Sequence, residues 1–216
     1  MINPVSSPIL QLVHRALKGE RLRQLPDQAL LQEFRDRGDQ AAFEALLHRH
    51  GPLVLGVCRS VRGCAADAED AFQATFIILA RKAASIRKTA SVSSWLHGVA
   101  HRTALKARAR EMNEARTPGR PASDPDALAW RQVRQVLHEE LSGLAERYRA
   151  PLVACYLEGK TQDEAAAQFG MAKSTLKERP ERGRSLLRTR LVRRGFGPAA
   201  LLAAGDKRQP AGQHHA

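Results

Sequence analysis

The chain has 216 residues and a formal net charge of +13, with 35 Lys and Arg residues against 22 Asp and Glu residues. This balance favours a polyanionic partner, because neutralising phosphates releases counterions and supplies sequence-independent affinity. No apolar run approaches the roughly 20 residues that span a bilayer, and the three cysteines match no disulfide or zinc template. The N-terminus also lacks the basic start and apolar core of a secretion signal, so we expect a cytoplasmic protein without a membrane partner.

The first third of the chain is expected to begin with a loosely held lead-in, residues 1–27, in which three prolines surround one short apolar patch. From Gln28 onward, apolar residues recur at three- and four-residue steps, which is typical of amphipathic helices. Asp39 is a good N-cap for the second helix. We expect a third helix to begin at Gly51-Pro52 and to end at Gly63.

The next predicted helix begins at Asp67 and has the sequence DAEDAFQATFIILARKA. Its bulky residues, including Phe72 and Phe76, can be buried, while acidic residues and Gln73 point outward in the first two turns. The helix dipole alone can explain acidic residues near a helix N-terminus. However, this is the one exposed acidic cluster expected in a very basic chain, and it would repel phosphate. The ligand of this face is therefore expected to be a protein.

A polar connection, SIRKTASVSS, and a basic amphipathic helix, WLHGVAHRTALKARAR, follow. An exposed Trp95 beside cations would suit single-stranded or melting DNA, because bases stack on aromatic faces while cations track the backbone. The alternative is that Trp95 belongs to the core. The cations expected to contact DNA are Arg87, Lys88, Arg102, Lys106, Arg108 and Arg110.

Residues 111–126, rich in Pro, Gly, Ser and charge, are predicted to form a linker. Two further helices are expected over 128–141 and 144–157, and residues 196–216 are expected to form a frayed tail. We find no strand pattern or internal repeat. The sequence therefore predicts an all-α fold with two small helical domains, 28–110 and 127–195, joined by a flexible linker.

The segment from Thr161 predicts a helix-turn-helix. Thr161 and Glu164 form a T-x-x-E capping box, Gly170 can adopt the positive φ that ends a helix, and Met171 would fill the space between the helices. The second helix carries seven cations and two anions between Lys173 and Arg190, which favours DNA contact over an ordinary solvated face. The second helix of such a motif enters the DNA major groove.

Sites for catalysis or cofactors are not expected. His97 and His101 lie i, i+4 on one helix, but no Glu follows the first His and no third ligand is evident. Nucleophile motifs and phosphate-binding glycine loops are absent from the sequence as well. We therefore expect no enzyme, no metal and no cofactor.

With these motifs in place, residues 28–192 resemble the sigma-70 family of bacterial RNA polymerase sigma factors, in the extracytoplasmic-function group. The resemblance rests on DAEDAFQATF, on SSWLHGVAHRTALKARAR and on LAERYRAPLVACYLEGKTQDEAAAQFGMAKSTLKERPERGRSLLRTRL, in that order and separated by a linker. It implies a region 2-like domain over 28–110, a region 4-like domain over 127–195, and a function in promoter recognition and transcription initiation.

The resemblance also implies the partners and site residues. The acidic helix would dock on the β′ clamp of core RNA polymerase through Asp67, Asp70, Gln73 and Phe76. The loop 85–93 and the helix from Trp95 to Arg110 would open and hold the −10 promoter element. The residues expected to contact the −35 element are Lys173, Ser174, Thr175, Lys177, Glu178, Arg179 and Arg182. The polymerase β flap and an anti-sigma factor are further partners that the resemblance implies.

The chain departs from the family at two positions. Arg102 stands where the family often has Asn, and Pro180 stands where it usually has Leu or another apolar residue. Because proline removes a helix hydrogen bond and clashes with the preceding turn, we predict a kink or break near Arg179-Pro180. Two rival functions use fewer of the motifs. They are a DNA-binding regulator that does not engage polymerase, and an RNA-binding or membrane-surface protein.

Overall fold

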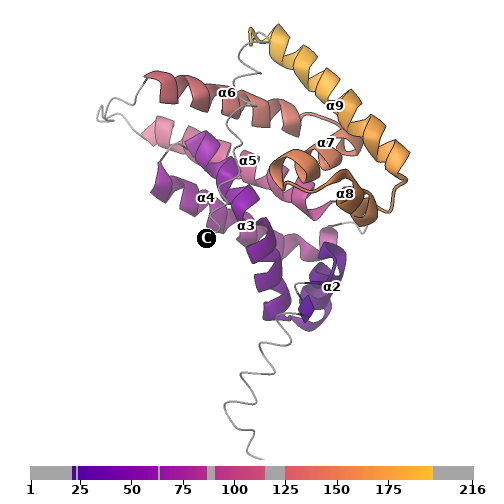
Figure 1. The fold of residues 1–216 in the computed structure, drawn as a ribbon. Helices are drawn as coiled ribbons and strands as arrows, with labels where there is room; N and C mark the ends of the chain where they lie inside the picture. The colour runs from indigo at the N-terminus through magenta and orange to yellow at the C-terminus, as the bar shows by residue number, and fades with distance from the viewer. Residues whose placement is uncertain (1–20, 23, 63, 87–90, 115–124, 197–216) are drawn as a thin grey trace, which may run out of the picture.

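The computed structural model describes residues 21–22, 24–62, 64–86, 91–114 and 125–196, with only the backbone of 111–114 and 125–131. Within these ranges every regular element is helical, which confirms the predicted fold class (Figure 1). The elements are α2 (Asp27–Arg37), α3 (Gln40–Arg62), α4 (Ala65–Lys82), η1 (Ala83–Ser85), α5 (Val92–Glu114), α6 (Pro125–Ser142), α7 (Glu146–Leu152), the π-helical turn η2 (Val153–Leu157), α8 (Gln162–Phe169) and α9 (Lys173–Arg193). None of these helices is long and apolar enough to cross a membrane.

Helix α3 is the centre of the first module, which we define as α2–α5. Helices α2, α4 and α5 all pack against α3 (Figure 1). Leu46 and Val54 on α3 are fully buried against Leu30 of α2, Leu79 of α4 and Leu96 of α5. Burying one such side chain contributes about 1.5–3 kcal/mol, so this core accounts for the parallel arrangement of four amphipathic segments.

Helix α3 continues through Gly51 and Pro52, so the prediction that a separate helix begins there is wrong. Pro52 is exposed, and the carbonyl group of His48, which loses its donor, can be hydrated instead. Leu46 and Leu53, on opposite sides of the expected boundary, are buried in the same core. Their shared burial offsets the lost hydrogen bond and keeps the two halves on one helix.

The second module, α6–α9, is built around the packing of α7 on α9. A Cβ atom at Gly183 would lie 2.9 Å from Cδ1 of Leu152, so glycine is what allows the two helices to approach this closely. The predicted helix over 144–157 is observed as α7 followed by η2. The buried residues of α9 form one row, namely Leu176, Pro180, Gly183 and Leu191.

Helix α9 runs unbroken from Lys173 to Arg193, so the predicted break at Pro180 is not observed (Figure 1). The proline ring lies in the buried row, where its apolar surface contributes to packing. After this position α9 packs on α7, where Gly183 lies against Leu152, and before it Leu176 packs in a cluster with Ala154, Ala165 and Ala166. Tertiary packing therefore overrides the local conflict.

We predict that Pro180→Leu raises the thermal stability of the chain. The substitution restores a backbone donor in the middle of α9 and keeps an apolar side chain in the buried row. A proline inside a helix costs about 3 kcal/mol, and part of this would be regained. Thermal denaturation followed by circular dichroism measures the change. An unchanged or lower midpoint would show that the proline is fully accommodated.

The two modules contact each other. Helix α6 packs on α3 and α5, while α7 and η2 pack on α5. Leu141, Leu144, Leu152 and Val153 of the second module belong to the same apolar cluster as the core of the first. Helix α5 ends at Glu114 and α6 begins at Pro125, so both extend into the predicted linker. Its remaining residues, 115–124, and most of the predicted lead-in and tail lie outside the described residues.

Candidate nucleic-acid interface

The helix-turn-helix forms as predicted. Thr161 Oγ1 accepts from the backbone N–H of Glu164 at 3.2 Å, and Glu164 accepts from the backbone N–H of Thr161 at 2.8 Å. The hydrogen bonds that the backbone N–H and the hydroxyl of Thr161 donate to the Glu164 carboxylate lower the pKa of Glu164. Gly170 ends α8 with a φ of 60°. Because the capping box and the left-handed turn are set by local sequence, this part of the motif could be predicted without tertiary information.

The residue that joins α8 to α9 is Leu176 rather than the predicted Met171. Leu176 is fully buried and clusters with Ala154, Ala165 and Ala166. Met171 is half-buried, and its sulfur accepts from Nη1 of Arg179 at 3.0 Å. Leu176 reaches the alanines of α8 because it lies on the inner side of α9, whereas Met171 lies in the turn between the helices.

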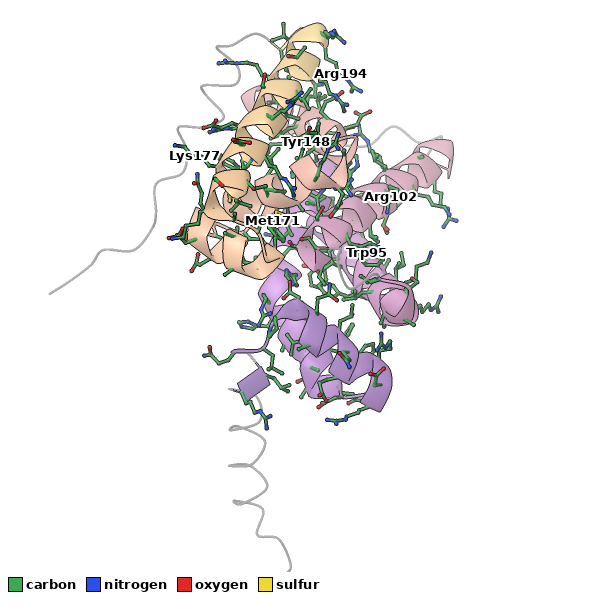
Figure 2. The ribbon with its side chains drawn as sticks, turned by 90° about the vertical axis from the view of Figure 1, so that its right-hand side faces the viewer. Trp95, Arg102, Tyr148, Met171, Lys177 and Arg194 are labelled. Atoms are coloured by element: carbon green, nitrogen blue, oxygen red, sulfur yellow. The ribbon has the colours of Figure 1, made fainter. Side chains whose placement is uncertain are left out.

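The N-terminal half of α9 presents most of the predicted −35 residues to solvent. Lys177 lies on the side of α9 that faces away from the other helices (Figure 2). Thr175 and Arg179 are half-buried. Lys173 forms an ion pair with Asp163 at 2.9 Å, but both side chains are more than two-thirds exposed and the pair contributes little. The exposed members of the predicted set are Lys173, Ser174, Lys177, Glu178 and Arg182.

Three cations in or just beyond the C-terminal half of α9 contact residues of the second module. Arg184 donates to the hydroxyl of Tyr156 at 2.7 Å and lies over its ring. Arg190 pairs with Glu140 at 3.6 Å. Arg194, just beyond the helix, donates to Glu139 at 2.9 Å, and this hydrogen bond lowers the pKa of Glu139. Lys177 and Arg182 are the exposed cations among the predicted −35 residues for which no ion pair is seen within the part of the chain that the structure describes.

Helix α5 carries the second cationic surface. Arg102, Lys106, Arg108 and Arg110 are all exposed. Arg102 folds back over Gly98, since a Cβ atom there would lie 3.2 Å from its Nη1, and Arg108 donates to Gln135 of α6 at 2.5 Å. Trp95 is half-buried, and part of its side chain packs against the core of the first module. Trp95 and Arg102 are labelled in Figure 2. Arg87 and Lys88 lie outside the described residues.

Helix α7 of the second module contacts Ser94, which directly follows the predicted −10 loop 85–93. Ser91, Val92, Ser93 and Ser94 are buried. Ser94 Oγ donates to Glu146 at 3.1 Å and accepts from Nε of Arg149 at 2.9 Å. These contacts could not be predicted from local patterns, because the partners stand more than 50 residues apart in the chain.

Helix α4 presents an acidic face that contains all the predicted polymerase-binding residues except Phe76. Asp70 and Gln73 are exposed, and Asp67 is half-buried in an ion pair with Arg62 at 3.3 Å. Phe76, predicted to bind polymerase, is only 4% exposed and belongs to the core, because it falls on the buried stripe of the helix. Ile77, which the prediction omitted, is 51% exposed next to Asp70 and Gln73.

The predicted histidine pair on α5 faces α6. His97 Nε2 lies 3.0 Å from Nδ1 of His138, and both rings are buried. Burial, together with the neighbouring histidines, lowers the pKa of His97, and burial lowers that of His138 to about 4. Two neutral imidazoles can share one hydrogen bond, so the contact between His97 and His138 joins α5 to α6. Within the described ranges, no group of three His, Cys, Asp or Glu residues could hold a metal ion.

Comparison with known proteins assigns the family. Residues 46–114 match the family model of Sigma-70 region 2, and residues 134–187 match Sigma-70, region 4. The chain is 30% identical over 154 residues to the ECF RNA polymerase sigma factor SigM of Mycobacterium tuberculosis, an alignment that covers 69% of this chain and 77% of SigM. It is 31% identical over 167 residues to the RNA polymerase sigma factor CarQ of Myxococcus xanthus, covering 73% and 93% of the two chains.

Among solved structures, CnrH in complex with the cytosolic domain of CnrY aligns with a TM-score of 0.41 and 22% identity, over 82% of this chain and 97% of CnrH. The family models cover one segment in each of the two modules. The relatives extend across both. The chain therefore belongs to the sigma-70 family, in its extracytoplasmic-function group, and is a sigma factor that directs transcription initiation by RNA polymerase.

Proposed function

We propose that this sigma factor binds core RNA polymerase through α4 and promoter DNA through α5 and α9. The observation that supports the proposal is the separation of charge on the surface. Asp70 and Gln73 form an exposed face on α4, while the exposed cations of α5 and of the first half of α9 lie on other helices. A phosphate backbone is attracted to the cationic surfaces and repelled by the acidic one, so the acidic face is available to a protein.

On this proposal, α5 would hold the opened −10 element and α9 would read the −35 element. Region 2-like and region 4-like domains correspond to the first and second modules. The work requires no catalytic residue, because docking on the duplex and trapping of unpaired bases supply the free energy of strand opening. We place this activity in the cytoplasm, and we expect an anti-sigma factor and the β flap as further partners.

The polymerase contact is tested by Asp70→Lys. Reversing the charge at the centre of the α4 face should reduce retention of the chain by immobilised core polymerase at least tenfold, through like-charge repulsion and lost contacts. Glu44→Lys is the matched control, because Glu44 is an exposed acidic residue on α3 away from this face. Equal losses in the two variants, or none in Asp70→Lys, would contradict docking through α4.

The same retention assay distinguishes our proposal from the rival function, a DNA-binding regulator that does not engage polymerase. A regulator would bind promoter DNA but would not be retained by core polymerase in any variant. Competition for the chain between a duplex promoter fragment, RNA and anionic vesicles separates the third possibility, a protein that binds polyanions by charge alone.

DNA binding through α9 should depend on individual cations. We predict that Lys177→Ala and Arg182→Ala each weaken binding to a promoter duplex and reduce the slope of log affinity against log salt by about one, because each removes one phosphate contact. Arg37→Ala is the control, since Arg37 is an exposed cation on α2 that pairs with Glu33 at 2.9 Å. The salt dependence of fluorescence anisotropy measures the slopes. Unchanged slopes for Lys177→Ala and Arg182→Ala would show that these two residues of α9 do not contact DNA phosphates.

A further inference from the structure

A buried ionic cluster joins the two modules at a place that the proposed polymerase and DNA surfaces do not include. His50 of α3 lies at its centre with no exposed surface. Its Nδ1 is 2.7 Å from Oε1 of Glu158, which follows η2 in the second module. Its Nε2 is 3.1 Å from Oδ2 of Asp27, the first residue of α2 in the first module. The side chains of Asp27 and Glu158 are each 7% exposed.

The geometry identifies the protonation state of His50. A neutral imidazole carries one N–H donor and one lone pair, whereas an imidazolium carries two donors. Nδ1 of His50 hydrogen-bonds to Glu158 and Nε2 lies within ion-pair distance of Asp27, so a charged ring is stabilised by both carboxylates, whereas a neutral ring could donate to only one of them. Burial works against the charged ring, but the hydrogen bonds and charges of Asp27 and Glu158 outweigh it and raise the pKa of His50 to about 9. His50 is therefore an imidazolium at neutral pH.

Further charged groups surround the two carboxylates. Arg49 donates to Asp27 at 2.6 Å, and both belong to the first module. Lys160 pairs with Glu158 at 3.1 Å, and both belong to the second. Gln168, which is neutral, reaches Asp27 across the boundary at 3.4 Å. His50 contacts one buried carboxylate of each module, and loss of its charge would leave two buried carboxylates without their shared partner.

The arrangement held by this cluster hides a segment that the proposed function requires. Ser91–Ser94, at the end of the predicted −10 loop, are buried, and Glu146 and Arg149 of α7 contact Ser94. Helix α7 must move away before promoter DNA can reach Ser94.

We propose that His50 is a latch between the modules: its imidazolium holds Glu158 to Asp27 and so keeps the second module over Ser91–Ser94. Releasing the latch shifts the chain toward an open arrangement. The link from opening to DNA access rests on the proposed function, but the latch itself does not. Proton release from His50 weakens the closed state. The closed-state pKa lies above the ordinary value of 6.5, so the contribution is complete below pH 6.5 and is lost as pH rises through about 9.

The latch is tested by the distance between the modules in the full chain. Donor and acceptor dyes are attached at Ala66→Cys on α4 and Ser185→Cys on α9, both exposed positions. The background carries Cys64→Ser and Cys155→Ser, while the buried Cys58 is left in place. Single-molecule energy transfer between pH 6.5 and 10 then gives the ratio of closed to open chains. No DNA or polymerase is present.

For the unmodified latch we expect the closed-to-open ratio to fall on the order of a hundredfold as pH rises from 6.5 to 10. His50→Gln should lower the ratio at pH 7 at least tenfold and flatten the pH dependence. His48→Gln is the matched control, because His48 is an exposed histidine two positions away on the same helix. It should leave both unchanged.

Glu158→Gln provides a second variant in the other module, in case His50→Gln loses helical structure. It should also open the chain at pH 7, because the imidazolium then lacks one of its two anions. A closed-to-open ratio that Glu158→Gln leaves unchanged, or a wild-type ratio that does not vary between pH 6.5 and 10, would overturn the latch. Neither result would bear on the polymerase contact, which the Asp70→Lys retention assay tests separately.

Discussion

Leu176→Ala is expected to destabilise the second module by about 2–5 kcal/mol and to abolish specific DNA binding. Leu176 is fully buried between α8 and α9, where its neighbours are the small side chains of Ala154, Ala165 and Ala166. Truncation removes most of the apolar surface that joins the two helices, and the alanines cannot fill the cavity. Without this contact, the orientation of α9 relative to α8 is no longer fixed.

Urea unfolding followed by circular dichroism measures the loss of stability, and anisotropy with a promoter duplex measures the loss of binding. Leu186→Ala is the control on the same helix, because Leu186 is 38% exposed. It should change stability by no more than about 0.5 kcal/mol. Should Leu176→Ala prove as mild as Leu186→Ala, α8 and α9 would have to be held together by other contacts.

Acidification is expected to destabilise the chain by about 2 kcal/mol between pH 6.5 and 5, through His138 at the contact between α5 and α6. The pKa of His138 is lowered to about 4 by burial, whereas an unfolded chain has the ordinary value of 6.5. The unfolded state therefore binds the proton first, and stability falls as pH drops below 6.5. His97, whose pKa is lowered in the same way, acts in the same direction.

The measurement is the free energy of unfolding in urea at pH 6.5 and at pH 5, above the range in which most carboxylates titrate. His138→Gln removes the titrating group and retains an acceptor for His97, so it should reduce the difference between the two pH values. His48→Gln, at an exposed position, should not. Equal acid sensitivity in all three chains would place the titrating group elsewhere.

The parts of this fold that the sequence predicts well are those set by neighbouring residues. The capping box of Thr161 and Glu164, the left-handed Gly170 and the Asp39 cap are local, and all three are observed. Local signals fail where a distant core decides. Pro52 and Pro180 are both helix breakers by local criteria, yet α3 and α9 continue through them. Residues on both sides of Pro52 pack in one core, and Pro180 lies in the buried row of α9.

In the candidate site, too, local features could be predicted from the sequence and contacts between distant residues could not. Exposure of Asp70 and Gln73 follows from the helical period of α4, and the same period places Phe76 in the core. The contacts between the modules could not be predicted. His50 and Glu158 stand 108 residues apart, and a pairing at that separation leaves no periodic or compositional trace.

Our central proposal is that the acidic face of α4 binds core polymerase while the cationic helices α5 and α9 bind promoter DNA. Run-off transcription tests this most directly, with core RNA polymerase, fragments of genomic DNA and the full chain at low ionic strength. The expected result is a discrete set of transcripts that appear only when the chain is added and that disappear with Asp70→Lys. If core polymerase neither retains the chain nor starts any new transcript in its presence, the chain does not initiate transcription.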